Sequence, residues 1–439
     1  MKKLFFSAVA IIVILTIGGC QKFNFWDHDN PHNSKIPDGK IATDWYRLQT
    51  RILLERNSAF NGALWGYIGI GLYEAVRPGI KGAASFSGKL YKTMPALPEP
   101  ENNQGYNWEI SANAALAGMV RSFFTGLTPA NSTSIDSLEA AWNEKLKPAQ
   151  SSAVFNRSQA YGQSIATAMH DWFLTDDFNA SNAGYVLPPA FPGSWQPTPP
   201  ALVPLPINPF VQNATPYIAE DVTAISPKFP LEYSETPGSP FYNMEKQLYD
   251  VNKALTAEQK AIALFWVDQG NGVGYTPPGH DFLFVTQAIE QTHSNLAVAA
   301  EVYAKAGIAI RDGFIVTFRS KYDNFLLRPV TYIQKVIEPG WLPFIPTPPH
   351  PEYPAAHAMV TGAVMQAVER VLGPHIKVTD HSYDFLNYAP ITFTSVFNYA
   401  EMAGISRNYG GIHYLISIDT GLKMAKEIGN RVGDINLHK

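Results

Sequence analysis

The sequence contains a single cysteine, Cys20, among its 439 residues. An intramolecular disulfide is therefore excluded, and the stability of the folded chain has to come from its packed core. After the first twenty residues, no stretch reaches the roughly 20 apolar residues that a membrane-spanning helix needs. The net charge of −4 lacks the positive excess that binding to phosphate backbones requires, which argues against nucleic acid as a partner.

The first twenty residues have the pattern of an export signal. Two lysines precede an apolar stretch that is short for a membrane span, and two glycines precede Cys20. This pattern resembles a bacterial lipoprotein signal, in which Cys20 becomes the lipidated mature N-terminus; a plain secretory signal is the alternative. We expect an exported protein that is anchored through this lipid alone on the periplasmic or cell-surface side of a bacterial membrane. Residues 1–20 would be the signal peptide and residues 21–40 a turn-rich tether.

The rest of the chain has helical periodicity. Hydrophobic residues make up 46% of the sequence, enough for a substantial core. Apolar residues recur at helical spacing in residues 41–183 and again in 256–439, and few segments alternate with a period of two. Prolines and large aromatic residues crowd residues 184–255, which favours an ordered, extended segment, with an interdomain linker as the alternative. We predict an all-α protein of two helical-bundle halves joined by this proline-rich segment.

Basic residues and histidines gather in three segments of the last third of the chain. In the first, Lys321 and Arg328 are seven residues apart, which would place them on one face of an α-helix that Pro329 ends. Two cations stacked in this way repel each other unless an anion lies between them. The segment therefore suggests anion binding, although a solvated basic face has the same pattern.

The second segment is a proline-rich loop that leads into a helix. Pro354 suits the first turn of that helix, so the backbone N–H groups of Ala355, Ala356 and His357 are expected to be free. Free N–H groups at a helix N-terminus bind an oxyanion by hydrogen bonds and by the helix dipole. The two alanines would let the anion approach closely, and His357 would act as acid or base.

The third segment contains Arg407, the pair Gly410 and Gly411, and His413. The glycines are expected to free the backbone, so that Arg407 and His413 converge on one point. A guanidinium offers a planar fork to the oxygens of an anion, and a neutral imidazole offers a nitrogen ligand. The three segments together predict a split oxyanion site.

In order along the chain, these segments follow the three-part pattern KxxxxxxRP, PSGH and SRxxxxxH, with PAAH at 354–357. The chain thereby resembles the vanadium-dependent haloperoxidases, which share this site with type 2 phosphatidic acid phosphatases and bacterial acid phosphatases. The resemblance extends to the WQPTPP, FWVDQ, TPPGH and PHPEYP segments and covers most of residues 40–432. It implies the helical fold of that superfamily.

The resemblance implies vanadate as the cofactor, with hydrogen peroxide and a halide as substrates. Vanadate would act as a Lewis acid that activates peroxide towards the halide. His413 would be the axial ligand of vanadium, and His357 would take a proton from peroxide. The oxygens of vanadate would be held by three basic side chains and a backbone group, namely Lys321, Arg328, Arg407 and Ala356.

Two further positions take their expected roles from the same resemblance, and two others depart from the family pattern. Asp268, in FWVDQ, would pair with the arginine or histidine of the site, and His350 occupies a position that hints at bromide or iodide rather than chloride. Ala355 replaces a serine that would donate to the anion, which would weaken its binding. Ser417 replaces an aspartate that usually lies four residues after the histidine, and Asp419 is a poorer substitute for it.

Three interpretations of the function stay open. A haloperoxidase would oxidise bromide or iodide with peroxide. An acid phosphatase would use His413 as the nucleophile towards a phosphate monoester, and the missing aspartate weakens this interpretation because a nucleophilic histidine needs a carboxylate to orient it. A lipoprotein could also bind an oxyanion without catalysis. We expect His280, in TPPGH, to be structural.

Overall fold

The computed structural model describes residues 37–55, 62–218, 225–268 and 273–439. In this part of the chain, extended pairing is confined to three isolated bridges and the antiparallel pair β1 (Val378–Asp380) and β2 (Ile391–Phe393). The remaining regular structure is helical, so the predicted all-α class is confirmed. The predicted signal peptide, the lipidation of Cys20 and residues 21–36 of the tether lie outside the described residues. Within the described ranges, no helix combines the length and the apolar character needed to cross a bilayer.

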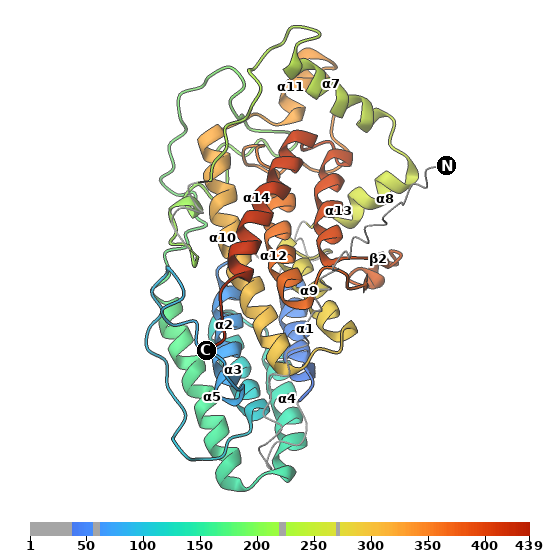
Figure 1. The fold of residues 1–439 in the computed structure, drawn as a ribbon. Coiled ribbons are helices and arrows are strands. Elements are labelled where there is room, and N and C mark those ends of the chain that lie inside the picture. Colours follow the sequence, from blue (N-terminus) through green and yellow to red (C-terminus); the bar gives the residue numbers. More distant parts are fainter. Residues whose placement is uncertain (1–36, 56–61, 219–224, 269–272) are drawn as a thin grey trace, which may run out of the picture.

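In the described part of the amino-terminal half, five helices pack together, in the lower part of Figure 1. Side-chain oxygens of Asn107, Thr128 and Ser151 cap three of them by accepting a backbone N–H three residues later, which satisfies a donor that the helix itself leaves free. α2 is buried along its whole length and so lies at the centre of this half. The helices are α1 (Lys40–Glu55), α2 (Leu64–Val76), α3 (Trp108–Phe123), α4 (Pro129–Leu146) and α5 (Ser152–Phe173).

The carboxyl-terminal half is built around α10 and α12, which pack against each other in the middle of Figure 1. α14 and α13 cover the other sides of α12. The helices of the carboxyl-terminal half are α8 (Ala257–Phe265), α9 (Pro277–Gln291), α10 (Leu296–Asn324), α11 (Pro329–Val336), α12 (Ala356–Leu372), α13 (Val396–Tyr409) and α14 (Leu415–Gly433). Short 3-10 turns are η1 (Arg77–Gly79), η2 (Lys147–Ala149), η3 (Val211–Asn213) and η4 (Asp384–Leu386).

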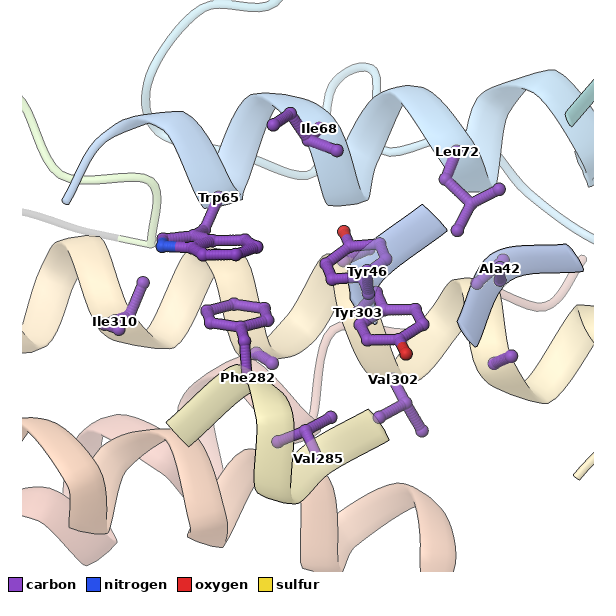
Figure 2. Close-up of a cluster of buried hydrophobic side chains, with 14 of the residues drawn as sticks. Ala42, Tyr46, Trp65, Ile68, Leu72, Phe282, Val285, Val302, Tyr303 and Ile310 are labelled. Carbon is purple, nitrogen blue, oxygen red and sulfur yellow. The ribbon is translucent and has the colours of Figure 1, made fainter. Parts of the chain in front are cut away.

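The two halves share one core, because α10 packs on α2 as well as on α12. Gly69 and Gly307 allow this close approach: a Cβ atom at either position would collide with backbone of the facing helix. Figure 2 shows the aromatic side chains at this junction. Tyr46 of α1 stacks on Tyr303 of α10 with ring centroids 3.5 Å apart, and Trp65 of α2 stacks on Phe282 of α9 at 4.0 Å. These rings join four helices from both halves.

The proline-rich segment, residues 184–255, is largely extended where the structure describes it, but it ends in a helix, α7 (Pro240–Lys253), that the proline count concealed. Ser239 caps α7, and Pro240 occupies its first turn, where a proline is favoured. Two backbone hydrogen bonds join the extended part to the end of α10: Trp195 N–H donates to Phe325 O at 2.7 Å, and Leu327 N–H donates to Gly193 O at 2.9 Å. The segment is therefore packed on the helices.

A buried charge cluster fixes a second part of this segment. Arg311 of α10 is fully buried and donates to both oxygens of Asp176, to Asp177 and to the backbone of Thr215. Its neighbour Asp312 accepts the N–H groups of two residues of the segment at 2.8 and 2.9 Å. The cluster thus ties the end of α5, the extended segment and α10 together.

We expect the substitution Arg311→Met to destabilise the fold by about 3–5 kcal/mol, because it leaves the buried carboxylate of Asp176 without the guanidinium that donates to both of its oxygens. Equilibrium unfolding in urea would measure this change. Arg121→Met is the matched control, since Arg121 pairs with carboxylates at the surface and such pairs contribute about 1 kcal/mol or less. Equal losses for the two variants would show that the buried cluster has no special role.

Candidate active site

The three predicted segments meet between the ends of α10, α12 and α13, but the first is not one helix. α10 ends at Asn324, and Phe325 adopts a left-handed backbone with φ 44°. Arg328 is then the N-cap of α11, and Pro329 begins that helix instead of ending one. The prediction that Lys321 and Arg328 share a helix face is therefore wrong. The physical reason is the pairing of residues 325–327 with the proline-rich segment, which takes these residues out of the helix.

Arg328 connects the other two segments. Its side chain is fully buried, and Nε donates to His350 O at 2.7 Å while Nη1 donates to Ile412 O at 3.0 Å. The same guanidinium reaches two imidazoles, His413 Nε2 at 3.1 Å and His350 Nδ1 at 3.0 Å. A guanidinium can only donate, so His413 Nε2 is an acceptor of this contact.

These contacts determine the tautomer of His413. Because Nε2 accepts from Arg328, the proton of the neutral ring is on Nδ1, which lies 2.7 Å from Glu352 Oε1. Burial, Arg328 and Lys321 lower the pKa of His413 well below its usual value, which keeps the ring neutral. His413 therefore presents a nitrogen lone pair at Nε2, held in place from the opposite side of the ring.

Glu352 was missed by sequence reasoning, although it lies in the PHPEYP segment. Its Oε1 accepts from His413 Nδ1 and from the backbone N–H of Tyr414, and its Oε2 accepts from Ser417 Oγ at 2.7 Å. Burial raises its pKa to about 7, against the influence of Lys321. The expectation that Ser417 leaves His413 without a carboxylate is wrong, because Glu352 comes from the neighbouring loop and Ser417 orients it. Asp419 is exposed and pairs with Lys423.

Lys321 holds the loop that carries Glu352. Its ammonium donates to three backbone carbonyls, Pro351 O at 2.9 Å, Glu352 O at 2.8 Å and Pro354 O at 2.6 Å. An ammonium has three donors, so direct contact with an anion would require one carbonyl to be exchanged. Burial and Arg328 lower the pKa of Lys321 well below its usual value, which an arriving anion would oppose. Its role as an oxyanion ligand stays a prediction.

The N-terminus of α12 differs by two residues from the prediction. The helix begins at Ala356 with Ala355 as its N-cap, so Pro354 lies before it and not in its first turn. Ala355 N–H donates to Ser417 O at 3.1 Å and is not free, contrary to expectation. Within the described residues, the N–H groups of Ala356 and His357 have no hydrogen-bond acceptor. These two remain available for an anion at the helix terminus.

Arg407 approaches from the last turn of α13 and therefore keeps helical geometry, unlike the prediction. Only Gly411 has the left-handed backbone, φ 78°, and it turns the chain from α13 towards His413. Arg407 Nε donates to Ser406 Oγ at 3.1 Å, and Nη2 donates to Trp266 O. Burial lowers the pKa of Arg407 to about 10, and it does the same to Arg328.

His357 has the most accessible side chain of the five predicted basic and histidine residues, 13% exposed. Its Nε2 lies 3.4 Å from Asp268 Oδ2 without making a hydrogen bond. Burial, followed by the charge of Arg407, lowers its pKa to about 4. His357 is therefore neutral at neutral pH and can accept a proton, with Asp268 positioned to stabilise the imidazolium that forms.

Asp268 is held by a residue that we expected to be only structural. His280 is fully buried and bridges two carboxylates, with Nδ1 3.1 Å from Asp268 and Nε2 3.2 Å from Asp380. Although burial opposes it, Asp268 and Asp380 raise the pKa of His280 to about 10. Tyr383 Oη also donates to Asp268 at 2.8 Å. The protonated His280 thus keeps Asp268 ionised beside His357.

We expect His280→Asn to destabilise the fold by about 3–5 kcal/mol at pH 6, because two buried carboxylates lose the cation between them. The folded-state pKa of His280 is raised, so its contribution is fully present below pH 6.5 and is lost as pH rises through about 10. Urea unfolding of both proteins at pH 6, 8 and 10 should show a difference that narrows with pH. A pH-independent difference would mean that His280 is not charged.

His350 lies behind the site, 7% exposed, with its ring edge-on to Phe318 at 5.6 Å. Its Nδ1 lies 3.0 Å from Arg328 Nη2, a donor, and 3.1 Å from Pro351 O, an acceptor, so these two contacts require opposite protonation of this nitrogen. Burial, Lys321 and Arg328 lower its pKa well below the usual value. His350 therefore acts in the neutral form, as a support for Arg328.

The site suits a multiply charged oxyanion. Within the described residues none of its three basic side chains forms an ion pair with a carboxylate, and burial lowers the pKa of each. Buried cations without counter-charges are costly, and an anion among them removes that cost. Two free N–H groups of α12 and the Nε2 atom of His413 complete a set of ligands that vanadate or phosphate would fit.

The helical fold and the arrangement of this site are similar to those expected from the resemblance to haloperoxidases and acid phosphatases. Residues 301–437 match the family model described as the VCPO second helical-bundle domain. The match covers the carboxyl-terminal third of the chain, which is thus similar to that domain.

Solved structures are similar to most of the chain. A bacterial vanadium-dependent iodoperoxidase superposes with a TM-score of 0.81 at 28% sequence identity, covering 92% of this chain and 98% of the other. Apo and holo forms of a bacterial vanadium-dependent chloroperoxidase share the fold, with TM-scores of 0.62 and 0.58 at 15% and 14% identity. The apo comparison covers 92% of this chain and 95% of the other, and the holo comparison 90% and 91%. No curated protein sequence matches the chain significantly.

Proposed function

We propose that the protein is a vanadium-dependent peroxidase that oxidises a halide with hydrogen peroxide at vanadate bound to His413. The observation that carries the proposal is the combination of uncompensated buried cations with a neutral imidazole, whose Nε2 accepts a hydrogen bond from Arg328 that a bound anion would replace. Vanadate, when bound there, would supply Lewis-acid activation of peroxide towards attack by halide. Its oxygens would be held by the guanidinium groups of Arg328 and Arg407, the N–H groups of Ala356 and His357, and Lys321.

Each residue of the site would then have a distinct role in the reaction. Glu352 keeps the proton of His413 on Nδ1, which leaves Nε2 as the ligand atom. His357 accepts a proton from peroxide at a ring nitrogen, and the carboxylate of Asp268 stabilises the resulting imidazolium. His280 holds Asp268 in the ionised state in which it can do this.

For the halide, we propose iodide or bromide over chloride. His350 supports this choice, since it places a neutral imidazole behind Arg328 where chloride-oxidising relatives tend to carry an aromatic residue. The similarity to an iodoperoxidase at 28% identity points in the same direction. Rates of oxidation of the three halides at equal concentration would decide it, and a preference for chloride would contradict the proposal.

The test of the reaction itself is halide oxidation by the purified protein. We expect formation of triiodide from iodide and peroxide to require added vanadate and to stop when vanadate is removed by dialysis against a chelator. If saturating vanadate and peroxide give no halide oxidation, the proposed reaction is wrong. Binding of phosphate or vanadate without any turnover would then identify a non-catalytic oxyanion-binding protein.

An acid phosphatase that acts through a phosphohistidine is the second candidate, and the contact between Glu352 and His413 favours it. A carboxylate 2.7 Å from Nδ1 supplies the orientation and charge stabilisation that a nucleophilic histidine needs. The geometry thus removes the argument that the missing aspartate made against this reaction. Hydrolysis of an aryl phosphate by the vanadate-free protein, inhibited by vanadate, would establish it.

We also propose that the protein is exported and is anchored to a bacterial membrane through a lipid on Cys20. The proposal rests on the basic, apolar and glycine pattern of the first twenty residues. Metabolic labelling with a radioactive fatty acid would test it, with Cys20→Ser as the control. Labelling that survives in Cys20→Ser would contradict it.

A further inference from the structure

Glu245 of α7 occupies a position where the helical pattern favours an apolar side chain. It lies on one face of the helix with Phe241 and Leu248, and these three side chains are the buried ones of α7. Phe241 and Leu248 belong to an apolar cluster that also contains Tyr414, whereas Glu245 is a fully buried acid beside it. A carboxyl group is costly to bury, so packing alone does not explain a glutamate here.

The carboxyl group of Glu245 has a single partner among the described residues. Its Oε1 accepts from the hydroxyl group of Tyr414, which is also fully buried, and its Oε2 has no hydrogen-bond partner. Burial raises the pKa of Glu245 well above its usual value, although the bond from Tyr414 opposes this. An unsatisfied buried polar atom lowers the stability of a fold, and such atoms are expected where function requires them.

Tyr414 connects Glu245 to the oxyanion cradle, which consists of His413, the three buried basic side chains and the free N–H groups of α12. Tyr414 directly follows His413, and its backbone N–H donates to Glu352 Oε1 at 3.1 Å. The same oxygen lies 2.7 Å from His413 Nδ1. A movement of Tyr414 would therefore shift the carboxylate that orients the His413 ring.

α7 is also held against the turn that leads to His413. Asn252, two turns after Glu245 on the same face of the helix, donates to Tyr409 O at 3.3 Å. A Cβ atom at Gly411 would lie 2.9 Å from Asn252 Nδ2, so α7 is in close contact with this turn. Because glycine leaves the backbone free to move, the chain before His413 has to be fixed by contacts from outside. α7, which packs on α11 and α13, supplies such contacts (Figure 1).

We propose that Glu245 is a positioning residue for His413, which it holds through Tyr414. The inference rests on the proposed binding of vanadate at His413. Without Glu245, the Tyr414 hydroxyl loses its acceptor, and the His413 ring is free to leave the orientation in which Nε2 faces the anion. Vanadate affinity then falls, although no residue that would touch vanadate has changed.

Vanadate binding to the full chain, measured by calorimetry and by 51V NMR, tests this role. The double substitution Glu245→Leu with Tyr414→Phe replaces both partners of the hydrogen bond by apolar groups, which is nearly neutral for stability. We expect it to leave the urea midpoint unchanged or higher and to shift the 51V signal. It should weaken vanadate binding about tenfold, the lower end of the effect of a residue that orients a metal-binding histidine.

Two further variants make the test specific. Glu245→Gln should retain the affinity, because its amide oxygen can still accept from Tyr414. Tyr249→Phe is the matched control, since it removes a bond from a tyrosine of α7 to Glu338, 2.6 Å long, that does not lead to His413. It should retain the affinity as well.

The outcomes separate this inference from the proposed function. Vanadate affinity that the double substitution leaves unchanged overturns the role of Glu245, and so does an equal loss in Tyr249→Phe or in Glu245→Gln. A weaker affinity that is accompanied by a lower urea midpoint would also overturn it, because Glu245 would then be only structural. If the unchanged protein binds vanadate but oxidises no iodide, the proposed reaction fails, while the affinities still decide the role of Glu245. Absent vanadate binding by the unchanged protein overturns both.

Discussion

Replacement of His413 by alanine is expected to abolish vanadate-dependent halide oxidation, with a loss of roughly 1000-fold or more, the scale observed when a residue bonded to the reacting group is removed. Among the site residues that the structure describes, His413 is the neutral imidazole with a partner at both ring nitrogens. Arg328 donates to its Nε2, and Glu352 accepts from its Nδ1. Triiodide formation and vanadate binding, followed by 51V NMR, would measure the two effects separately.

The control for this variant is His375→Ala, because His375 is exposed and lies at the far end of α12 from the cradle. It should retain full activity. Unfolding curves of both variants would show whether lost activity reflects lost structure. Vanadate-dependent oxidation that survives in His413→Ala would place the cofactor elsewhere and would overturn the proposed site.

Glu352→Gln is expected to lower vanadate affinity by about 10- to 100-fold, the usual effect of changing the partner that orients a metal-binding histidine. The amide can still accept from His413 Nδ1, so the loop should keep its shape, but the negative charge beside the ring is lost. Ser417→Ala removes one donor to Glu352 and should have a smaller effect. Affinity in Glu352→Gln equal to that of the unchanged protein would exclude an electrostatic role for the carboxylate.

The unchanged protein and Glu352→Gln should also differ in how their vanadate affinity depends on pH. The pKa of Glu352 is raised to about 7, so the acid is protonated below that pH and ionised above it. The contribution of this group to stability therefore falls as pH rises from about 4.5 through 7. Its ability to orient His413 increases over the same pH range, because only the ionised carboxylate places a negative charge beside the ring. The ratio of vanadate affinities, unchanged protein over Glu352→Gln, should increase as pH rises through about 7.

Helical periodicity was sufficient to predict the all-α fold class and most helices, because a helix with an apolar face at helical spacing can bury that face in many different folds. It failed where a contact distant in sequence decided the local conformation. α10 stops at Asn324 because the residues that follow it pair with a segment far earlier in the chain, Phe325 with Trp195 and Leu327 with Gly193. α7 was hidden among prolines, although Ser239 and Pro240 form a recognisable helix start.

The site shows the same limit. The motif predicted that Arg328, Arg407, His357 and His413 lie near one another, and the structure places Arg328 beside His413 and Arg407 near His357. It could not reveal Glu352, which reaches His413 from 61 positions away through a loop that Lys321 holds. Only the glutamate among the prolines of PHPEYP gave a signal, because an acidic residue there has no evident surface role.

The contact between Ser417 and the loop before α12 has a consequence for the order of assembly. Ser417 O accepts from Ala355 N–H and Ser417 Oγ donates to Glu352, so the cradle takes shape only after α14 has docked. A chain that is still being synthesised, or that is cut before residue 413, lacks His413 and α14 and therefore cannot hold the anion. An anion that binds only the finished fold adds about 2.7 kcal/mol to its stability at a concentration 100 times Kd. Vanadate or phosphate would thus favour complete molecules over partly folded ones.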